Sequence, residues 1–401
     1  TVPDFFAKRF HDKNNVITAL SALVIIIFFI PYTASGFAAC GKLFNSLFGI
    51  NYQVAMMLSA LLIVGYTITG GFNAVCVTDL VQSIVMTGAL AIVLIYGISR
   101  AGGWTAVMDN AAALPGYLSL TSTFDVASGS EVKYNFLTIF STAAWGLGYF
   151  GMPHILVRFM AIEDEKKLVL SRRIASVWVV IAMTAGVLIG IVGLGMTKAG
   201  ALDTLTGSNS ETIIVRIAGI ISQHNALTAL IAGIILAGIL AATMSTADSQ
   251  MLAAASGVSQ NIVHDFLKIK ISEKTNLLIA RLTIVGIAIV SIFLARNPDS
   301  SVFKIVSFAW AGFGGAFGAV VLCSLFWKRC NLAGAIAGII SGGATVFIWK
   351  YLVRPLGGIL DIYELLPAFI VSLIFIIVVS LLTKAPDEEI VREFEAAGKK
   401  A

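Results

Sequence analysis

Charged residues are scarce in this sequence. Only 12% of its 401 residues are Asp, Glu, Lys or Arg, whereas a soluble domain carries about 25%. Hydrophobic residues make up 58% of the chain, which is more apolar surface than a soluble fold could bury. The composition therefore excludes an ordinary soluble protein and predicts a protein that lies within a membrane.

The sequence also has few residues that carry enzyme chemistry. It shows no phosphate-binding loop, no metal-ligand spacing and no nucleophile triad, which argues against an enzyme. His154 and His264 fall near inner helix ends and are expected to be solvated. The cysteines are scattered and are expected to be unpaired packing residues. They are Cys40, Cys76, Cys323 and Cys330.

Long hydrophobic runs make up most of the sequence. A helix needs about 20 apolar residues to cross roughly 30 Å of hydrocarbon, and runs of that length occur about ten times. They lie near 15–39, 51–72, 74–99, 135–158, 172–196, 226–266, 275–296, 302–327, 331–353 and 363–384. The second and third are expected to be joined by a tight turn at 70–73, where Gly and Asn permit one.

Lys and Arg are concentrated in alternate connections between these runs. With the N-terminus inside, the inner segments hold more Lys and Arg than the outer ones, as the positive-inside rule requires. This predicts cytoplasmic chain ends, a membrane domain over 1–384 and a solvated tail over 385–401. The net charge of +5 then does not indicate a nucleic-acid partner. The outer segment 210–222 is expected to form an interfacial helix or lid, or a plain surface helix.

A polar run at 243–250 interrupts the sixth hydrophobic segment. Polar side chains in hydrocarbon are costly and mark functional positions. At 100° per residue, one helix face holds a set of small oxygen-bearing residues, with a carboxylate at its edge. These residues are Ala242, Ser245, Thr246 and Ser249, and the carboxylate is Asp248. Oxygen ligands suit a small hard cation, so the run predicts an ion pathway in a transporter or channel.

Two alternatives accompany this interpretation. Ser245 and Thr246 taken alone are typical of hydroxyls that bond back to their own helix, and it is the clustering with Asp248 and Ser249 that favours an ion site. A complete sodium shell would also require free carbonyls from a facing, broken helix.

Asp79 is a second carboxylate inside a predicted span, with Thr78 and Gln82 beside it. An intramembrane carboxylate is a functional hypothesis by default. The alternative is a carboxylate that a neighbouring helix satisfies. If Asp79 and Asp248 lie near one site, they could hold a cation together or share a proton, and the sequence leaves both open.

An aromatic pair, Trp145 and Tyr149, lies at i, i+4 in the middle of the fourth span. Belt aromatics belong at the membrane interfaces, so this pair predicts the floor of a site for a small, partly apolar solute, with core packing as the alternative. Pro153 loosens the helix next to it. Tyr32, which follows Pro31 in the first span, is a similar case. The glycine-rich segment 309–318 predicts close helix packing or, alternatively, a flexible gate.

Several stretches together resemble the sodium/solute symporter family, and the resemblance covers nearly the whole chain. They are Tyr32-Thr33-Ala34-Ser35-Gly36, Gly70-Gly71-Phe72, Thr78-Asp79, Trp145-Gly146-Leu147-Gly148-Tyr149-Phe150-Gly151, Pro153-His154-Ile155-Leu156, Met244-Ser245-Thr246 and Ala309-Trp310-Ala311-Gly312-Phe313-Gly314. The resemblance implies an all-α polytopic membrane protein with the inverted-repeat fold of the sodium-coupled leucine-transporter type. Members of this kind have about thirteen spans, so the first helices, including the unwound first core helix, are expected to be absent here.

The resemblance also implies roles for individual residues. Ser245 and Thr246 match sodium-binding hydroxyls, and Ala242 matches a sodium-binding carbonyl. A second sodium position of some members matches Asp79, Asp248 and Ser249, although some relatives have a serine in place of Asp248. Positions implicated in proline binding, or in the gate above it, match Tyr32, Trp145, Tyr149 and Pro153.

The function implied is sodium-coupled import of L-proline by alternating access, in the inner membrane of a bacterium. A symporter for another small organic solute such as pantothenate is one alternative. A transporter-like membrane sensor is another, although the short tail shows no signalling domain. A third is an inactive fragment, because the unwound helix would supply half of the ion cage.

Overall fold

A computed structural model describes residues 1–400, without the side chains at positions 71, 73, 399 and 400. Its first helices are α1 (Val2–Phe10), α2 (Val16–Phe48), α3 (Tyr52–Arg100) and α4 (Trp104–Ala112). A small antiparallel hairpin follows, with β1 (Ser122–Asp125) paired to β2 (Ser130–Lys133). The middle of the chain contains α5 (Phe136–Ala143), η1 (Ala144–Gly151), α6 (Pro153–Met160), η2 (Glu165–Lys167), α7 (Leu168–Lys198), η3 (Gly207–Thr212), α8 (Ile213–Ser222), α9 (Ala226–Ser256) and η4 (Gly257–Phe266).

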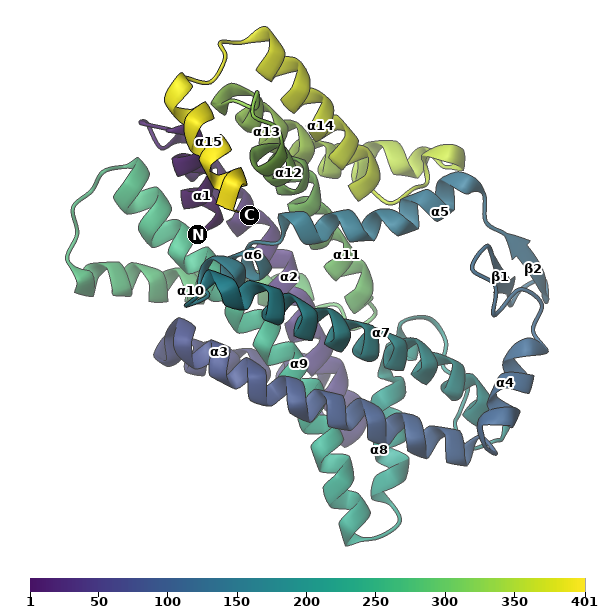
Figure 1. The fold of residues 1–401 in the computed structure, drawn as a ribbon. Helices are drawn as coiled ribbons and strands as arrows, with labels where there is room; N and C mark the ends of the chain where they lie inside the picture. Colours follow the sequence, from purple (N-terminus) through teal and green to yellow (C-terminus); the bar gives the residue numbers. More distant parts are fainter. Residues whose placement is uncertain (401) are drawn as a thin grey trace.

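The last part of the chain is also helical. Its elements are α10 (Glu273–Ala295), α11 (Val302–Phe313), η5 (Gly314–Gly318), α12 (Ala319–Phe326), α13 (Leu332–Ile348), η6 (Trp349–Val353), η7 (Arg354–Leu356), η8 (Gly358–Leu360), α14 (Leu365–Leu382) and α15 (Glu388–Lys400). In Figure 1, α2 runs through the middle of the bundle, where it contacts α3, α9, α10 and α11. The helix α7 lies along α3, and α13 packs against α14.

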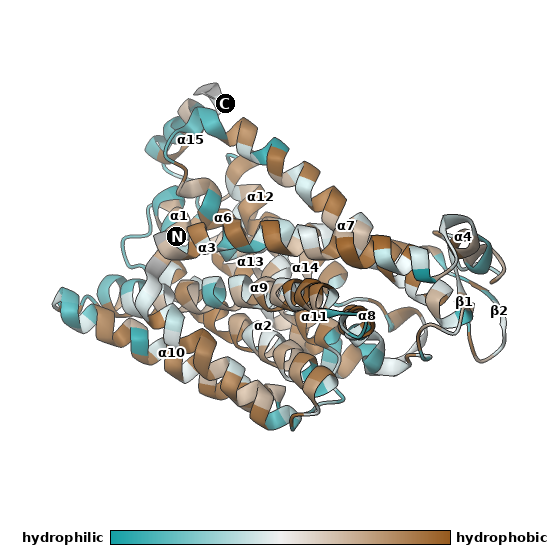
Figure 2. Cartoon of the chain, turned by 90° about the horizontal axis from the view of Figure 1, so that it is seen from below, coloured by the Kyte–Doolittle hydropathy of each residue, from teal (hydrophilic) through white to brown (hydrophobic). Residues whose placement is uncertain are grey.

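Nine segments within the described residues are long and apolar enough to cross a membrane. Figure 2 shows hydrophobic residues along the outer faces of several of these helices, such as α7 and α10. Outward-facing apolar side chains on long helices are what a lipid environment requires. The protein is therefore a multi-pass, all-α membrane protein, as the composition predicts.

The segment 135–158, predicted as the fourth crossing, is a broken helix and is not among these nine segments. It consists of α5, the 3₁₀ helix η1 and α6, and the backbone at Met152 is extended, with φ −80° and ψ 107°. The local sequence permits the break, because η1 contains Gly146, Gly148 and Gly151, and Pro153 lacks the amide needed to continue an α-helix. This break places non-helical backbone inside the bundle, next to the predicted aromatic pair.

The turn predicted at 70–73 is wrong. The structure has one 49-residue helix, α3, across this segment, and its two halves, Tyr52–Gly70 and Ala74–Arg100, are each long and apolar enough for a crossing. A glycine inside a helix costs only about 1 kcal/mol relative to alanine. A turn in apolar surroundings would leave backbone amides unpaired at a higher cost.

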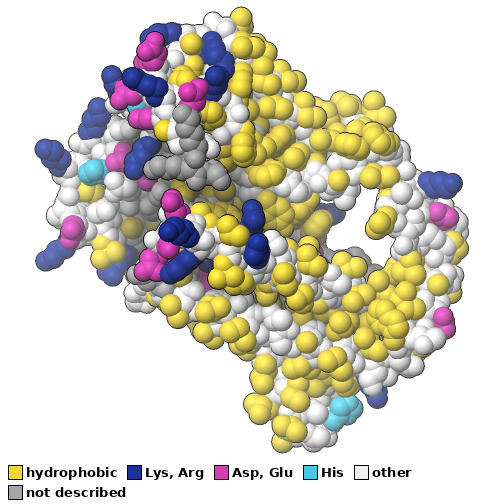
Figure 3. Space-filling view, viewed as in Figure 1, with side chains coloured by type: hydrophobic (Ala, Val, Ile, Leu, Met, Phe, Trp, Pro, Cys, Tyr) yellow, Lys and Arg dark blue, Asp and Glu magenta, His cyan; other side chains and the backbone are white. Residues whose placement is uncertain are grey.

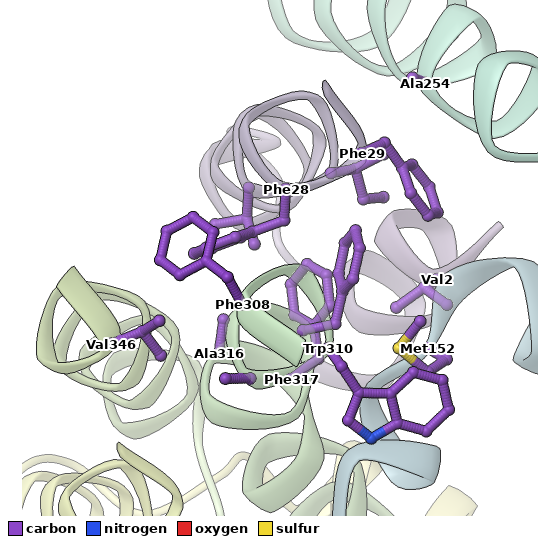
Figure 4. Close-up of a cluster of buried hydrophobic side chains, with 14 of the residues drawn as sticks. Val2, Phe28, Phe29, Met152, Ala254, Phe308, Trp310, Ala316, Phe317 and Val346 are labelled. Atoms are coloured by element: carbon purple, nitrogen blue, oxygen red, sulfur yellow. The ribbon is translucent and has the colours of Figure 1, made fainter. Parts of the chain in front are cut away.

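Close packing around α2 and α11 builds the core. Figure 4 shows Phe28 of α2 beside Phe308 of α11, and Phe29 on the side of Val2 and Met152. Phe28 lies against Gly312, where a Cβ would collide with its ring. Gly314 and Gly318 likewise approach α14 and η1 closely. The predicted packing role of the glycine-rich segment is confirmed.

Charged side chains gather at the end of the molecule that carries α1 and α15, and an apolar surface extends away from it (Figure 3). The predicted solvated tail forms the helix α15, which packs on α1. Glu393 accepts a hydrogen bond from His11 at 2.8 Å, and Arg9 lies over the Phe394 ring at 4.9 Å. At 210–222 the predicted helix is present as α8, and its buried residues pack against α9.

Candidate functional site

The predicted sodium-binding hydroxyls lie on α9. Ser245 Oγ and Thr246 Oγ1 both donate to the carbonyl oxygen of Ala242, at 3.2 and 3.1 Å. Back-bonding, the alternative considered for this pair, is therefore present. A hydroxyl that donates its proton keeps its lone pairs, so these oxygens remain able to bind a cation. The three residues form one compact group of oxygen atoms on a half-buried helix face.

Three helices meet one turn further along α9. Arg158, in the last turn of α6, donates from Nη2 to Oδ2 of Asp79 on α3 at 2.5 Å and to Oγ of Ser249 on α9 at 2.9 Å. The Asp79 side chain is 15% exposed and that of Arg158 is 38% exposed. Asp79 is thus partly satisfied by a neighbouring helix, which was the alternative considered for it.

Asp248 lies beside this pair and is fully buried. Tyr66 on α3 donates its hydroxyl to Asp248 Oδ2 at 2.6 Å. We call Asp79, Arg158, Ser249, Asp248 and Tyr66 the carboxylate cluster. Among the described residues, Oδ1 of Asp79 and Oδ1 of Asp248 are buried without a hydrogen-bond partner. Buried acceptors of this kind are costly when unpaired, and they are oxygen ligands that a cation can satisfy.

Two members of the carboxylate cluster are not among the residues predicted for the site. Arg158 lies five positions after Pro153, in the last turn of α6, and this helix places it next to Asp79. Tyr66 is an aromatic hydroxyl in mid-span, the same signal that identified Tyr149. Both join α9 to other helices, so neither contact is visible in the pattern of a single helix.

A cavity of about 770 Å³ lies beside the carboxylate cluster, between α3, α6, α9 and α10. Arg158 and Ser249 line it, together with Thr67, Pro153 and His154. The prediction that His154 is solvated is incomplete, because its ring packs 5.7 Å from Phe29 and its Nδ1 is buried. The cavity therefore leaves space next to two members of the cluster, Arg158 and Ser249.

The aromatic pair occupies a different place, where η1 meets α11. The Trp145 indole lies nearly parallel to that of Trp310 at 5.2 Å and to the Phe303 ring at 5.5 Å. Trp310 Nε1 donates to the Trp145 carbonyl at 2.9 Å. Trp145 therefore also has the packing role considered as its alternative. Tyr149 meets the Trp310 ring edge-on at 4.8 Å and stays 41% exposed.

Trp310 joins the two members of the pair and was missed as a site residue. A Cβ at Gly148 would collide with the Trp310 indole, and one at Gly151 would collide with the Phe313 backbone. These two glycines allow the broken helix to pack directly against α11 and η5. Only the tertiary contact reveals this role.

Tyr32 and Pro153 meet at the start of α6. Pro153 is its first residue and is buried, and the Tyr32 ring lies 6.0 Å from the ring of His154. The neighbouring Thr33 donates to Gln250 Oε1 on α9 at 3.3 Å. The structure thus brings Tyr32 close to the start of α6, where Pro153 lies. The hydroxyls of Ser245 and Thr246 donate within α9, to the carbonyl of Ala242, and not to the carboxylate cluster.

A second carboxylate site lies before α8. Glu211 accepts hydrogen bonds from Lys42 Nζ at 2.9 Å, Ser301 Oγ at 2.7 Å, and the amides of Val302 and Phe303 at 3.1 and 3.2 Å. We call these residues the Glu211 cluster. Burial alone would raise the pKa of Glu211, but the hydrogen bonds outweigh it and hold that pKa below its ordinary value. The cluster ties η3 to the end of α2 and to the N-terminus of α11.

A helical membrane bundle with a broken helix near polar and charged side chains is an arrangement that many secondary transporters share. The chain belongs to the sodium:solute symporter family, whose model matches residues 1–342. It is therefore a sodium-coupled transporter and not an enzyme.

The comparison with individual proteins agrees. The osmoregulated proline transporter OpuE of Bacillus subtilis is 40% identical over 98% of this chain and 76% of that protein. A sodium/proline symporter of Staphylococcus aureus is 38% identical over 96% of this chain and 73% of that protein. The solved structure of a sodium-coupled sialic acid symporter covers 97% of this chain and 78% of its own, with a TM-score of 0.73 at 18% identity. This likeness confirms the predicted sodium-coupled leucine-transporter type of fold.

Proposed function

We propose that the protein imports L-proline together with sodium by alternating access. The observation that carries the substrate is the similarity to two relatives named as proline transporters, at 40% and 38% identity over almost the whole chain. The membrane is the inner membrane of a bacterium, with both chain ends cytoplasmic. The gathering of charged residues around α1 and α15 supports this orientation.

Sodium binds at two neighbouring places on α9 in this proposal. The hydroxyls of Ser245 and Thr246, with the Ala242 carbonyl, form the first. Asp79, Asp248 and Ser249 contribute to the second, where the two unpaired carboxylate oxygens support the assignment. Arg158 already holds Asp79 Oδ2 and Ser249 Oγ. A second sodium ion must therefore share these oxygens with the guanidinium or displace it.

Proline binds along the broken helix in this proposal. Its apolar ring suits an aromatic surface. Tyr149 offers one, with Trp310 packed between it and Trp145, and Tyr32 and Pro153 form the neighbouring wall. At a membrane potential of about 100 mV, each entering sodium contributes about 2.3 kcal/mol. That contribution alone supports a proline gradient of roughly fortyfold. The membrane domain extends over 1–384, and 385–401 form the cytoplasmic tail.

Uptake of labelled L-proline into proteoliposomes tests the function. We expect uptake with an inward sodium gradient and none with an equal potassium gradient. Excess unlabelled pantothenate, sugar or sialic acid should leave uptake unchanged. Sodium-driven uptake of one of these solutes in place of proline would overturn the substrate and keep the family.

Two glycines of η1 form a matched pair for the solute site. A Cβ at Gly148 would meet the Trp310 indole, whereas a Cβ at Gly146 meets nothing within 4 Å. We expect Gly148→Ala to raise the apparent KM for proline about tenfold, since moving a packed ring by overfilling costs roughly 1–3 kcal/mol. Gly146→Ala should transport normally. Equal behaviour of the two variants would count against a solute site at η1.

A further inference from the structure

The connection between α13 and α14, residues 349–364, is fixed by a buried carboxylate. The side chain of Glu364 is only 2% exposed and accepts from Arg354 Nη1 at 3.1 Å, and Lys350 Nζ lies 3.7 Å from its other oxygen. Arg354 also donates to Asp361 at 2.8 Å. A buried carboxylate with two cationic partners holds its backbone in one place. The backbone of the residue next to Glu364 is therefore held in a fixed position.

That residue is Tyr363, and it contacts both sides of the solute region. Its amide donates to Ser141 Oγ on α5 at 2.6 Å. Its ring lies nearly parallel to the Trp145 indole on η1, with centroids 5.9 Å apart and 19° between planes. Its hydroxyl donates to the Ser307 carbonyl on α11 at 2.7 Å. One side chain thus joins the broken helix to α11.

The same connection touches α11 a second time. Lys350 Nζ lies 4.1 Å from the centroid of the Phe308 ring. Both residues line a cavity of about 1020 Å³ that also includes Glu211 and Phe303. Phe303 in turn stacks on Trp145. The connection therefore borders this cavity, which Glu211 also lines, and is linked through Phe303 to the Trp145 indole.

We propose that Tyr363 is a positioning residue that sets the solute affinity of the transporter through Trp145. Its ring backs the Trp145 indole, and its hydroxyl holds α11 against α5 and η1. The hairpin of α13 and α14 thereby controls a site to which it contributes no lining residue. The inference rests on the proposed function, because it takes Trp145 as part of the solute site.

Two substitutions in the full chain separate the two contacts. Tyr363→Leu removes the ring stack and should raise the apparent KM for proline roughly fivefold with little change in Vmax, the factor expected for an aromatic pair. Tyr363→Phe keeps the ring and should leave KM nearly unchanged. In combination with Trp145→Leu, which removes the other ring of the stack, the effect of Tyr363→Leu should be strongly non-additive. Additive effects, or a change in Vmax alone, would overturn the positioning role.

A second measurement needs no solute and so separates this inference from the proposed function. In a Ser307→Cys background, which keeps the backbone carbonyl, Tyr363→Phe should speed labelling by a membrane-impermeant maleimide roughly fivefold, because the hydrogen bond to α11 is lost. Tyr351→Phe is the control, since Tyr351 lies on the same connection and is 59% exposed. Unchanged labelling would overturn the link to α11. Faster labelling in a protein that does not transport proline would keep the link and reject the substrate.

Discussion

The carboxylate cluster and the Glu211 cluster are built from the same kinds of groups, but they differ in how fully their carboxylate oxygens are hydrogen-bonded. Each joins three parts of the chain through acidic side chains. Both oxygens of Glu211 accept hydrogen bonds, four in all, from a lysine, a serine and two amides. In the carboxylate cluster, Asp79 and Asp248 each keep one buried oxygen that no described residue satisfies.

The difference indicates what each cluster is for. A carboxylate with four donors is saturated, so the Glu211 cluster is suited to holding η3, α2 and α11 together. A buried carboxylate with an unpaired oxygen is costly until a cation or donor reaches it. The carboxylate cluster is therefore suited to a ligand that arrives and leaves. Substitutions in the two clusters should consequently change different quantities.

The largest expected effect is that of Asp79→Asn. It removes the charge that faces Arg158, and breaking a partly buried pair of this kind costs about 2 kcal/mol after allowance for the exposure of Arg158. We expect the rate of sodium-driven proline uptake to fall roughly thirtyfold, at an unchanged amount of protein in the membrane. Asp109→Asn, at an exposed aspartate of α4, is the control. If Asp79→Asn reduced folded protein as much as uptake, Asp79 would belong with Glu211 as a structural carboxylate.

The next effect concerns the hydroxyls on α9. Thr246→Ala should raise the sodium concentration for half-maximal uptake about tenfold, because one oxygen ligand of the first ion is lost. Thr243→Ala on the same helix is matched to it, since the Thr243 hydroxyl also bonds back to a carbonyl, that of Ile239 at 3.0 Å. Only the Thr246 variant should change the sodium dependence. The same shift in both variants would mean that back-bonding, and not ion binding, explains the result.

A smaller effect is expected from Glu211→Gln. The amide keeps one acceptor oxygen but loses the ion pair with Lys42. The two side chains are 11% and 23% exposed, so the pair should contribute near the upper end of the range for partly exposed pairs, about 1 kcal/mol. Uptake at saturating sodium should slow about threefold, because η3 is held less firmly to α11. The sodium concentration for half-maximal uptake should stay the same. A shifted sodium dependence would erase the distinction between the clusters.

The smallest effect is a pH dependence of stability. The pKa of Glu211 is lowered in the folded protein below its ordinary value of 4.5. Its contribution to stability is therefore present above pH 4.5 and is lost as the pH falls through the lowered pKa. Thermal unfolding of the wild type and Glu211→Gln in detergent should differ at pH 7 and converge once the pH has fallen below the lowered pKa. A difference that persists at low pH would show that the charge of Glu211 is not what stabilises the cluster.

Several elements of the fold could be predicted from hydropathy alone. The boundaries of α9 and η4, α10 and α14 follow the long apolar runs, because lipid exposure imposes a minimum length and composition on each crossing. The two wrong predictions, the turn at 70–73 and the unbroken crossing at 135–158, fall in segments where Gly is frequent. At 70–73 the helix continues, and at 144–152 it breaks, since a glycine permits either outcome and the neighbouring helices decide between them.

The residues of the candidate site also divide into those that the sequence predicts and those that it does not. Ser245, Thr246 and Asp248 could be found by helix periodicity, because a polar face on one apolar helix is a local pattern. Arg158, Tyr66 and Trp310 could not. Each acts through a contact between helices that are far apart in the chain, 79 positions in the case of Arg158 and Asp79.

The sequence by itself determined that this protein lies in a membrane, which segments are apolar enough to cross it, and which face of α9 carries hydroxyl and carboxylate side chains. These follow from composition and period, which are properties of neighbouring residues. Only the tertiary structure decided that Arg158 faces Asp79, that Glu211 caps α11 and that Tyr363 backs Trp145. Such pairings depend on how separate helices pack, and the energy of packing and of buried hydrogen bonds is defined only when those helices meet.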